Sequence, residues 1–93
     1  MKKNIQNLID KLNNDDFTKE LWENFVSDDG STQIIVSVGE CEDYTIYEDE
    51  SVIQGRWGVL SEIKNHGTLT EELADKIVGE AGKFAHDLIE AYS

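Results

Sequence analysis

The central segment of the chain, residues 33–48, reads QIIVSVGECEDYTIYE and predicts a β-hairpin. Apolar residues alternate with others along both of its halves, and β-branched and aromatic types dominate, which is typical of strands buried on one side. The turn between the halves is longer than two residues, so the strand register stays open by one residue. The alternating positions are Ile34, Val36 and Val38 in the first half and Tyr44 and Ile46 in the second.

Before the hairpin, the apolar spacing changes from that of a strand to that of a helix. Apolar residues recur at i, i+3, i+4 and i+7 within residues 4–12, which predicts a helix that ends near the turn-forming residues 13–16. Residues 17–26 are ambiguous, because their apolar residues fit a helix or an imperfect strand. The local pattern slightly favours the helix.

After the hairpin, two further helices are predicted. Residues 49–67 begin with acids, which helix N-termini favour, and carry apolar residues at helical spacing. Gly55 and Gly58 weaken this helix by about 1 kcal/mol each relative to alanine. Residues 68–71 have capping-box spacing and precede an amphipathic stripe that reaches Tyr92. The predicted fold class is α+β, with an N-terminal helix, a small antiparallel sheet of two or three strands, and then two C-terminal helices.

Length and composition limit the chain to one domain. Its 93 residues are 39% hydrophobic, and 20 Asp and Glu stand against 8 Lys and Arg, for a formal net charge of −12. This charge repels phosphates and anionic lipid, so we expect neither direct nucleic-acid binding nor membrane contact. The lone Cys41 cannot form an internal disulfide, and the N-terminus lacks an apolar signal-peptide core. We therefore expect a single-domain cytoplasmic protein over residues 1–93.

The sequence contains no recognisable motif for catalysis, metal binding or cofactor binding. Cys41 has no partner base in a catalytic motif, since His66 and His86 lie in none. Residues 28–30 suggest calcium but lack the alternating ligands and the closing glutamate of an EF-hand. The glycines lack the Lys-Ser/Thr ending of a phosphate-binding loop. We expect no enzymatic activity, no catalytic residue, no metal site and no cofactor.

The distribution of charge is the most informative feature of the sequence. From Glu20 to Gly55 the chain contains ten acids and no Lys or Arg, and six of these acids lie between Glu40 and Glu50, around the predicted hairpin. Such a segment is either a solvated face that keeps the protein soluble or a surface that imitates phosphates and docks on the Arg and Lys of a nucleic-acid-binding protein. The complete absence of basic residues slightly favours the second interpretation.

Four segments of the chain also carry a resemblance to a known family. They are residues 4–18 (NIQNLIDKLNNDDFT), 32–38 (TQIIVSV), 43–44 (DY) and 50–52 (ESV). These segments resemble a small, acidic, prophage-encoded anti-CRISPR protein family that inhibits the type II CRISPR effector nuclease. The resemblance implies an N-terminal helix, a three-stranded antiparallel sheet completed by residues 17–26, and further helices. It also implies binding in the cleft of the guide-loaded nuclease that reads the short motif beside the DNA target, so that duplex DNA cannot dock.

The resemblance assigns roles to individual acids. Asp16 matches the family's acidic residue at the end of the first helix, and the acids of residues 40–43 match its acidic turn between the central strands, which is one residue shorter here. Residues 66–93 depart from the family, so the two acids near the start of the last helix are candidates by charge and position only. The expected partner-binding residues are Asp16, Glu40, Glu42, Asp43, Glu48, Asp49, Glu50, Glu71 and Glu72.

Together these features predict a non-enzymatic inhibitor that mimics DNA. Its expected partner is the basic DNA-binding cleft of a CRISPR RNA-guided nuclease, and it is expected to act as a monomer or weak dimer in the cytoplasm of a bacterial host. Two alternatives stay open. The same acidic surface suits an antirestriction protein or a nuclease-toxin immunity protein. The apolar stripe from Leu69 to Tyr92 suits a helical interaction module, in which the acids only solubilise the protein.

Overall fold

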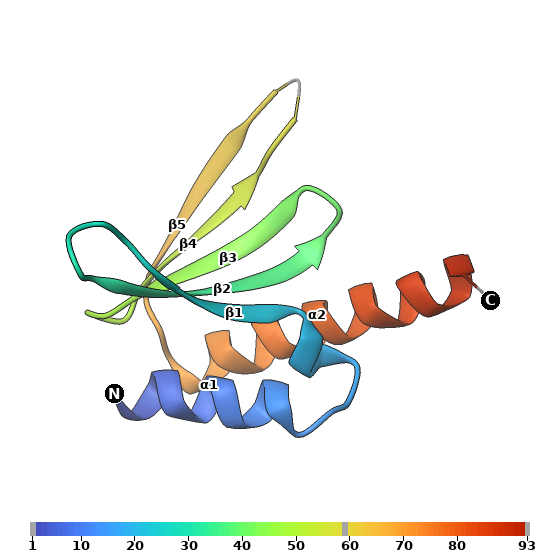
Figure 1. Ribbon diagram of the computed structural model, residues 1–93, viewed down its shortest axis with the longest axis horizontal. Coiled ribbons are helices and arrows are strands. Elements are labelled where there is room, and N and C mark those ends of the chain that lie inside the picture. The colour runs from blue at the N-terminus through green and yellow to red at the C-terminus, as the bar shows by residue number, and fades with distance from the viewer. Residues whose placement is uncertain (1, 59, 93) are drawn as a thin grey trace.

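Among residues 2–58 and 60–92, which the computed structural model describes, two helices cover one face of a five-stranded antiparallel sheet (Figure 1). The strands lie in the sheet in the same order as in the chain, so each strand pairs with its neighbours in sequence. The elements are α1 (Lys3–Asn13), a short 3-10 turn η1 (Thr18–Glu20), β1 (Trp22–Val26), β2 (Thr32–Gly39), β3 (Glu42–Tyr47), β4 (Ser51–Arg56), β5 (Glu62–Thr68) and α2 (Glu71–Tyr92).

The strand register places one apolar row of each central strand under the helices. Val36 pairs with Tyr44, and Ile46 lies between its partners Ile34 and Val52. All five side chains are buried. The predicted hairpin of residues 33–48 is thus confirmed, but the prediction of a turn longer than two residues is wrong. Only residues 40 and 41 separate β2 from β3, and the pairing register shifts between residues 37 and 39.

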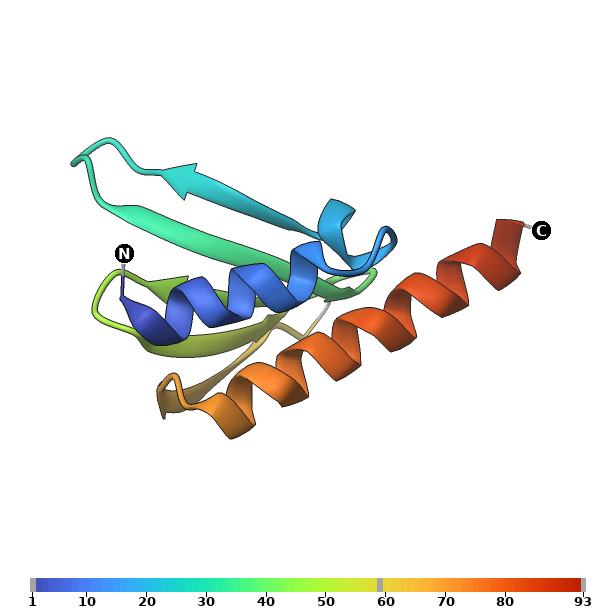
Figure 2. The same cartoon turned by 90° about the horizontal axis from the view of Figure 1, so that it is seen from below.

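Both helices pack on the same face of the sheet, as the view from below shows (Figure 2). The predicted N-terminal helix is confirmed as α1. It buries the four apolar residues of its stripe, and each large aliphatic side chain removed from water contributes about 1.5–3 kcal/mol. On α2, three of the four buried residues are alanines, so mostly small side chains lie against the core. The buried residues of the two helices are Ile5, Leu8, Ile9 and Leu12 of α1 and Ala74, Ile77, Ala81 and Ala85 of α2.

The start of α2 is capped two residues later than the capping-box spacing predicts. The Oγ1 atom of Thr70 accepts a hydrogen bond from the backbone N–H of Leu73 at 3.1 Å, so Thr70 rather than Thr68 acts as the cap. Glu71 and Glu72 follow in the first turn, where the partial positive charge of the helix N-terminus favours carboxylates. The predicted C-terminal amphipathic helix is otherwise confirmed.

The predicted fold class is wrong in its sheet and in its helix count. Residues 49–67 do not form a helix. They contribute β4 and β5, with residue 59 outside the described part of the chain, so the sheet has five strands and a single helix follows it. The spacing of the apolar residues in this segment fits either a helix or a strand, and strand pairing with β3 selects the strand. Val52 is buried opposite Ile46 of β3, and Gly55, unfavourable within a helix, is buried within β4.

Residues 17–26 also differ from the local preference for a helix. One short 3-10 turn precedes β1, and β1 pairs with β2 along the edge of the sheet. The strand that the family resemblance implied is therefore present at Trp22–Val26. Two more strands than the resemblance implied lie on the far side of the hairpin. Pairing with the long strand β2 outweighs the weak helical spacing of this segment.

Two of the hairpin turns use a residue in the left-handed conformation. In the β1–β2 turn the N–H of Gly30 donates to the carbonyl of Ser27 at 2.9 Å, and Gly30 has φ = 86°. In the β3–β4 turn the N–H of Glu50 donates to the carbonyl of Tyr47 at 2.9 Å, and Glu50 has φ = 70°. Glycine adopts this conformation without strain, whereas a residue with a Cβ atom is destabilised there. The β3–β4 turn is therefore strained at Glu50, whereas the β1–β2 turn has glycine at the left-handed position.

We predict that Glu50→Gly raises the free energy of unfolding by about 0.5–1 kcal/mol, because it removes this strain. Glu50→Gln is the matched control, since it removes the same charge and keeps the Cβ atom. Gly30→Ala should have the opposite effect and lower the free energy of unfolding by about 1 kcal/mol. Urea denaturation of the three variants measures both effects. Equal gains for Glu50→Gly and Glu50→Gln would attribute the effect to charge instead.

Candidate functional site

The sheet separates most of the expected partner-binding residues into two groups at its opposite ends. We call one end the turn end. It holds the β1–β2 turn, the β3–β4 turn with residues 48–50, and the start of α2 with residues 71–72. The other, the groove end, holds the β2–β3 turn with residues 40–43 and faces the C-terminal half of α2 (Figure 1). The expected site is therefore not one continuous surface.

At the turn end, two of the expected residues hold the backbone of the turns. A side-chain oxygen of Glu48 accepts hydrogen bonds from the N–H and the hydroxyl of Thr32, at 2.8 and 2.7 Å. Asp49 accepts from the N–H and the hydroxyl of Ser51, at 2.9 and 2.6 Å. The hydroxyl bonds, followed by the backbone bonds, lower the pKa of both carboxyls, because they stabilise the charged form. These acids have a structural role in their hairpins.

Asp29 plays the same part in the β1–β2 turn. One of its oxygens accepts from the hydroxyls of Ser27 and Ser31, each at 2.6 Å, and from the N–H of Ser31 at 2.9 Å. These bonds, led by that from Ser27, lower the pKa of Asp29 from its ordinary value of 3.8 to about 2. Three acids of the turn end thus stay ionised while they fix the turns.

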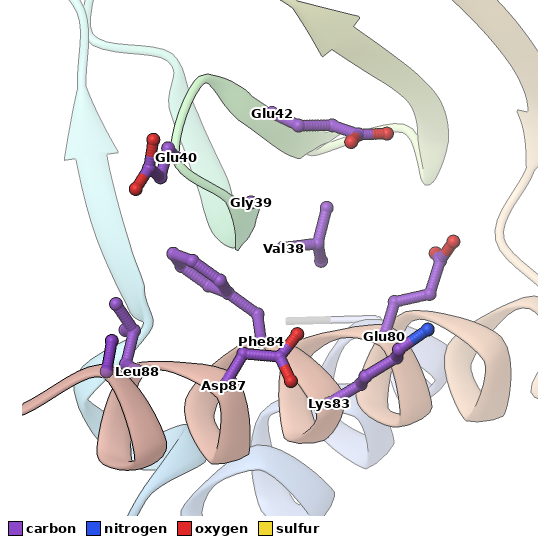
Figure 3. A pocket seen from close by; sticks show the side chains of 10 residues that line it. Val38, Gly39, Glu40, Glu42, Glu80, Lys83, Phe84, Asp87 and Leu88 are labelled. Atoms are coloured by element: carbon purple, nitrogen blue, oxygen red, sulfur yellow. The ribbon is translucent and has the colours of Figure 1, made fainter. Parts of the chain in front are cut away.

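At the groove end, the C-terminal half of α2 and the β2–β3 turn enclose a groove of about 580 Å³. Figure 3 shows Phe84 pointing from α2 toward the turn, and Val38 on the sheet side of the groove. Leu88 extends this apolar lining along α2. Acids stand around it on both sides, and Lys83 is the one cationic side chain among the described lining residues. The acids are Glu40 and Glu42 from the turn region and Glu80 and Asp87 from α2.

The four groove acids differ in how firmly they are held. Glu42 lies 3.6 Å from the guanidinium of Arg56 and accepts a hydrogen bond from the side-chain amide of Gln54. Glu80 accepts a hydrogen bond from the hydroxyl of buried Tyr44; burial, followed by this carboxylate, raises the pKa of Tyr44. Within residues 2–58 and 60–92, Glu40 and Asp87 make no such contact. Two acids therefore build the walls of the groove, and two are available to a partner.

Asp43 does not line the groove, although it is the neighbour of Glu42 in sequence. Successive residues of a strand point to opposite faces, so Asp43 lies on the side of the sheet away from the helices. There it pairs with Gly55 in β4, and one carboxylate oxygen accepts a hydrogen bond from the indole N–H of Trp57 at 3.4 Å. Burial raises the pKa of Asp43, and the Trp57 hydrogen bond partly opposes this effect.

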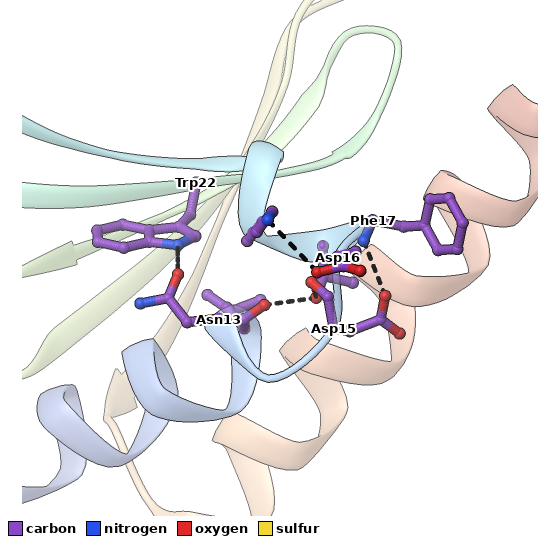
Figure 4. A network of polar contacts seen from close by, with 8 residues as sticks. Asn13, Asp15, Asp16, Phe17 and Trp22 are labelled. Carbon is purple, nitrogen blue, oxygen red and sulfur yellow. Dashed lines mark hydrogen bonds and ion pairs between the residues drawn. The ribbon is translucent and has the colours of Figure 1, made fainter.

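Asp16 lies apart from both groups, in the loop between α1 and η1. It pairs with Lys19 at 3.3 Å, and its side chain is 89% exposed (Figure 4). The same loop is held by Asp15, which accepts from the N–H of Phe17 at 2.8 Å, and by the indole of Trp22, which donates to Asn13 at 2.8 Å. Asp16 thus carries one neutralising cation of its own and lines none of the groove.

Sequence reasoning missed the acids that α2 contributes to the groove. Glu80 and Asp87 are seven residues apart, which places them on the same side of a helix, beside Phe84 and Leu88. That spacing was readable in the sequence. What it did not reveal is that the β2–β3 turn, about forty residues away in the chain, lies opposite them.

Few carboxylates in the described part of the chain form an ion pair with Lys or Arg. Among residues 2–58 and 60–92, Lys or Arg side chains pair only with Asp75, Asp16 and Glu42, although the chain has 20 acids. The arrangement is therefore suited to attract cationic side chains.

Residues 2–58 and 60–92 hold no group of three or more His, Cys, Asp or Glu side chains arranged to bind a metal ion. None of the described helices is long and apolar enough to cross a membrane.

The lowered pKa of Asp29 predicts how the β1–β2 turn responds to acid. A carboxyl with a lower pKa in the folded state binds fewer protons there, so it stabilises the fold above about pH 4 and loses this effect as the pH falls toward 2. Asp29→Asn should thus be less stable than the wild type at pH 7, and the difference should shrink on acidification. Urea denaturation between pH 7 and 2.5 measures it.

The control for this prediction is Asp28→Asn, which removes the same charge from the same turn. Asp28 accepts no hydrogen bond from the described residues, so this variant should stay closer to the wild type at pH 7. A stability difference for Asp29→Asn that is constant across the pH range would contradict the role given to its carboxylate.

Comparison with known proteins gives no relative from which to transfer a function. No protein-family model, no curated protein and no solved structure matches the chain.

Proposed function

We propose that this protein is a non-enzymatic inhibitor that binds the basic DNA-binding cleft of a nuclease through its groove end. One observation carries the proposal. Four carboxylates from two distant parts of the chain surround an apolar groove whose described lining includes a single cation, Lys83. A net charge of −12 adds a long-range attraction toward any basic surface.

The physical basis is competition between carboxylates and phosphates for the same side chains. A DNA-binding cleft presents Arg and Lys, which form strong charge-assisted hydrogen bonds with carboxylates as well as with phosphates. The β2–β3 turn and the end of α2 flank the groove, and in Figure 1 the end of α2 extends beyond the sheet. Acids on two such projections can reach cationic side chains in a cleft, while the apolar lining between them supplies contact area.

The proposed target is a guide-loaded type II CRISPR nuclease, which the sequence resemblance suggests. The five-stranded sheet departs from the fold that the resemblance implied, so the support for this target comes from the short matching segments and the charge. A restriction enzyme or a nuclease toxin would offer the same cationic side chains. For the competing idea of an apolar stripe on the last helix that docks a partner, Leu69, Ile77 and Ala81 are buried in the protein's own core, so only the exposed C-terminal end of the stripe, with Tyr92, supports it.

The direct test is a DNA-cleavage assay with purified guide-loaded type II nuclease. Inhibition is expected when the protein is added before the target DNA and is expected to be lost when it is added afterwards, because the two compete for one cleft. Binding should weaken with added salt, since charge contacts are screened over about 8–10 Å near physiological ionic strength. Absence of binding to the CRISPR nuclease, together with binding to a restriction enzyme or a nuclease toxin, would change the target and retain the mode of action.

The groove is tested by a pair of variants with equal charge. Glu40→Gln with Asp87→Asn removes the two groove acids without a partner, and Asp28→Asn with Glu72→Gln removes two acids at the turn end. Each pair changes the formal net charge from −12 to −10, because two carboxylates become neutral amides. We expect the groove pair to weaken inhibition about tenfold and the turn-end pair to have a much smaller effect. Equal losses would indicate binding by overall charge alone.

A further inference from the structure

The sheet face opposite the helices is uncovered within the described chain (Figure 1). Strand alternation identifies the residues on this side, which we call the open face. Solvated faces of antiparallel sheets ordinarily carry polar residues, whereas this one combines polar and large apolar side chains. Three of the apolar residues are well exposed, namely Phe25 at 48%, Trp57 at 45% and Ile63 at 60%. Ile35 and Ile53, which both flank Thr45 of β3, are partly buried between them.

Trp57 is held in a defined position on the open face. Its ring lies over Gly55, so closely that a Cβ atom on that glycine would come within 2.5 Å of the indole. Its indole N–H donates to Asp43, the β3 residue paired with Gly55, at 3.4 Å. The ring is thus held by its hydrogen bond to Asp43 and by the space that Gly55 leaves without a side chain, while nearly half of the residue stays exposed. A rigid, exposed Trp is a common anchor of protein interfaces.

The two tryptophans of the chain have different surroundings. Trp22 donates its indole N–H to Asn13 at the end of α1 and packs against the buried core. Trp57 has no residue of the helices as a partner. Trp22 therefore stabilises the loop after α1 and the core. Trp57 contributes to neither, so its exposed ring is not explained by packing of the fold.

The charged side chains on the open face of the described strands, Glu23 and Asp43, are both acidic. Near the start of β1, residues that line a hollow of about 190 Å³ include Glu20, Glu23 and Ile35. Asp43 adds a carboxylate beside Trp57, on the other side of β2 from this hollow. No Lys or Arg occupies an open-face position in the described strands. The face therefore offers carboxylates, an indole ring and aliphatic side chains, and it lacks a cation of its own.

We propose that the open face is a second docking surface, which binds a protein surface that presents arginine or lysine among aliphatic residues. Cationic side chains are attracted both to carboxylates and to the face of an indole ring, and aliphatic residues cover Ile35, Ile53 and Ile63. This surface lies across the sheet from the groove and does not depend on the function proposed for the groove.

Charge complementarity distinguishes this occupant from two others. Single-stranded nucleic acid also stacks on exposed aromatic residues of a sheet, but it requires cations to track its phosphates, and the open face has none within the described strands. A second copy of this chain would place Asp43 and Glu23 of both copies in one interface, and like charges there repel. A basic partner meets neither difficulty.

The experiment is an NMR titration of the isotopically labelled protein with a short synthetic peptide of alternating arginine and leucine. The two indole N–H signals give an internal comparison, because Trp57 lies on the open face and Trp22 at the loop after α1. We expect the signals of Trp57, Thr45 and Ile53 to shift and that of Trp22 to stay in place. A peptide of arginine and serine tests charge alone, and a peptide of leucine and serine tests apolar contact alone; both should bind more weakly.

Two variants sharpen the test. Trp57→Ala removes the anchor, and Gly55→Ala leaves the indole in the chain but displaces it from its seat; each should weaken peptide binding about tenfold. The unchanged Trp22 signal reports that both variants are folded. The groove pair Glu40→Gln with Asp87→Asn should bind the peptide as the wild type does.

Three results would overturn the proposal. The first is a set of shifts confined to the groove end or spread evenly over the acidic surface. The second is equal binding of the arginine–serine peptide, which would show attraction by charge alone. The third is a set of open-face shifts that depend on protein concentration without any peptide, which would identify a second copy as the occupant.

Discussion

Burial of alternate residues of β2, β3 and β4 beneath two helices is the constraint on which the rest of the structure depends. Tyr44 lies at its centre, fully buried, with its ring 5.4 Å from that of His66 and its hydroxyl bonded to Glu80 of α2. Once Tyr44 faces the helices, strand geometry fixes the side of every neighbour. Glu42 must then face the groove and Asp43 must face the open side.

The protein tolerates a large excess of negative charge by using its acids in different ways. At the turn end, Asp29, Glu48 and Asp49 accept hydrogen bonds that shape the hairpins, and these bonds favour the ionised form. Glu71 and Glu72 lie where the first turn of α2 favours negative charge. Near the groove, by contrast, Glu40 and Asp87 have no such use within the described chain. A structural reason accounts for part of the acidity, and two of the acids without one, Glu40 and Asp87, line the groove.

The sequence predicted the elements whose patterns are unambiguous and local. The four-residue apolar stripe of α1 and the alternation from residue 33 to residue 48 needed no tertiary information. The apolar spacing of residues 49–67 is compatible with both a helix and strands. These residues form β4 and β5 because β4 pairs with the free edge of β3. The site was less predictable for a related reason. A register open by one residue leaves the facing of Asp43 undecided, because a one-residue slip reverses every side chain of a strand.

The strand order has a consequence for how the chain folds. Each strand pairs with the one that precedes or follows it, so the sheet can be assembled from successive hairpins with short closing loops. The contacts that span the chain are those between the helices and from α1 to the β5–α2 connection, such as the bond from Asn4 to the carbonyl of Leu69. Closing that long loop is the costly entropic step, and it is also what covers the apolar face of the sheet. Before this step, both faces of the hairpins are exposed to water. In the native protein the helices cover one of these faces, and only the other stays exposed.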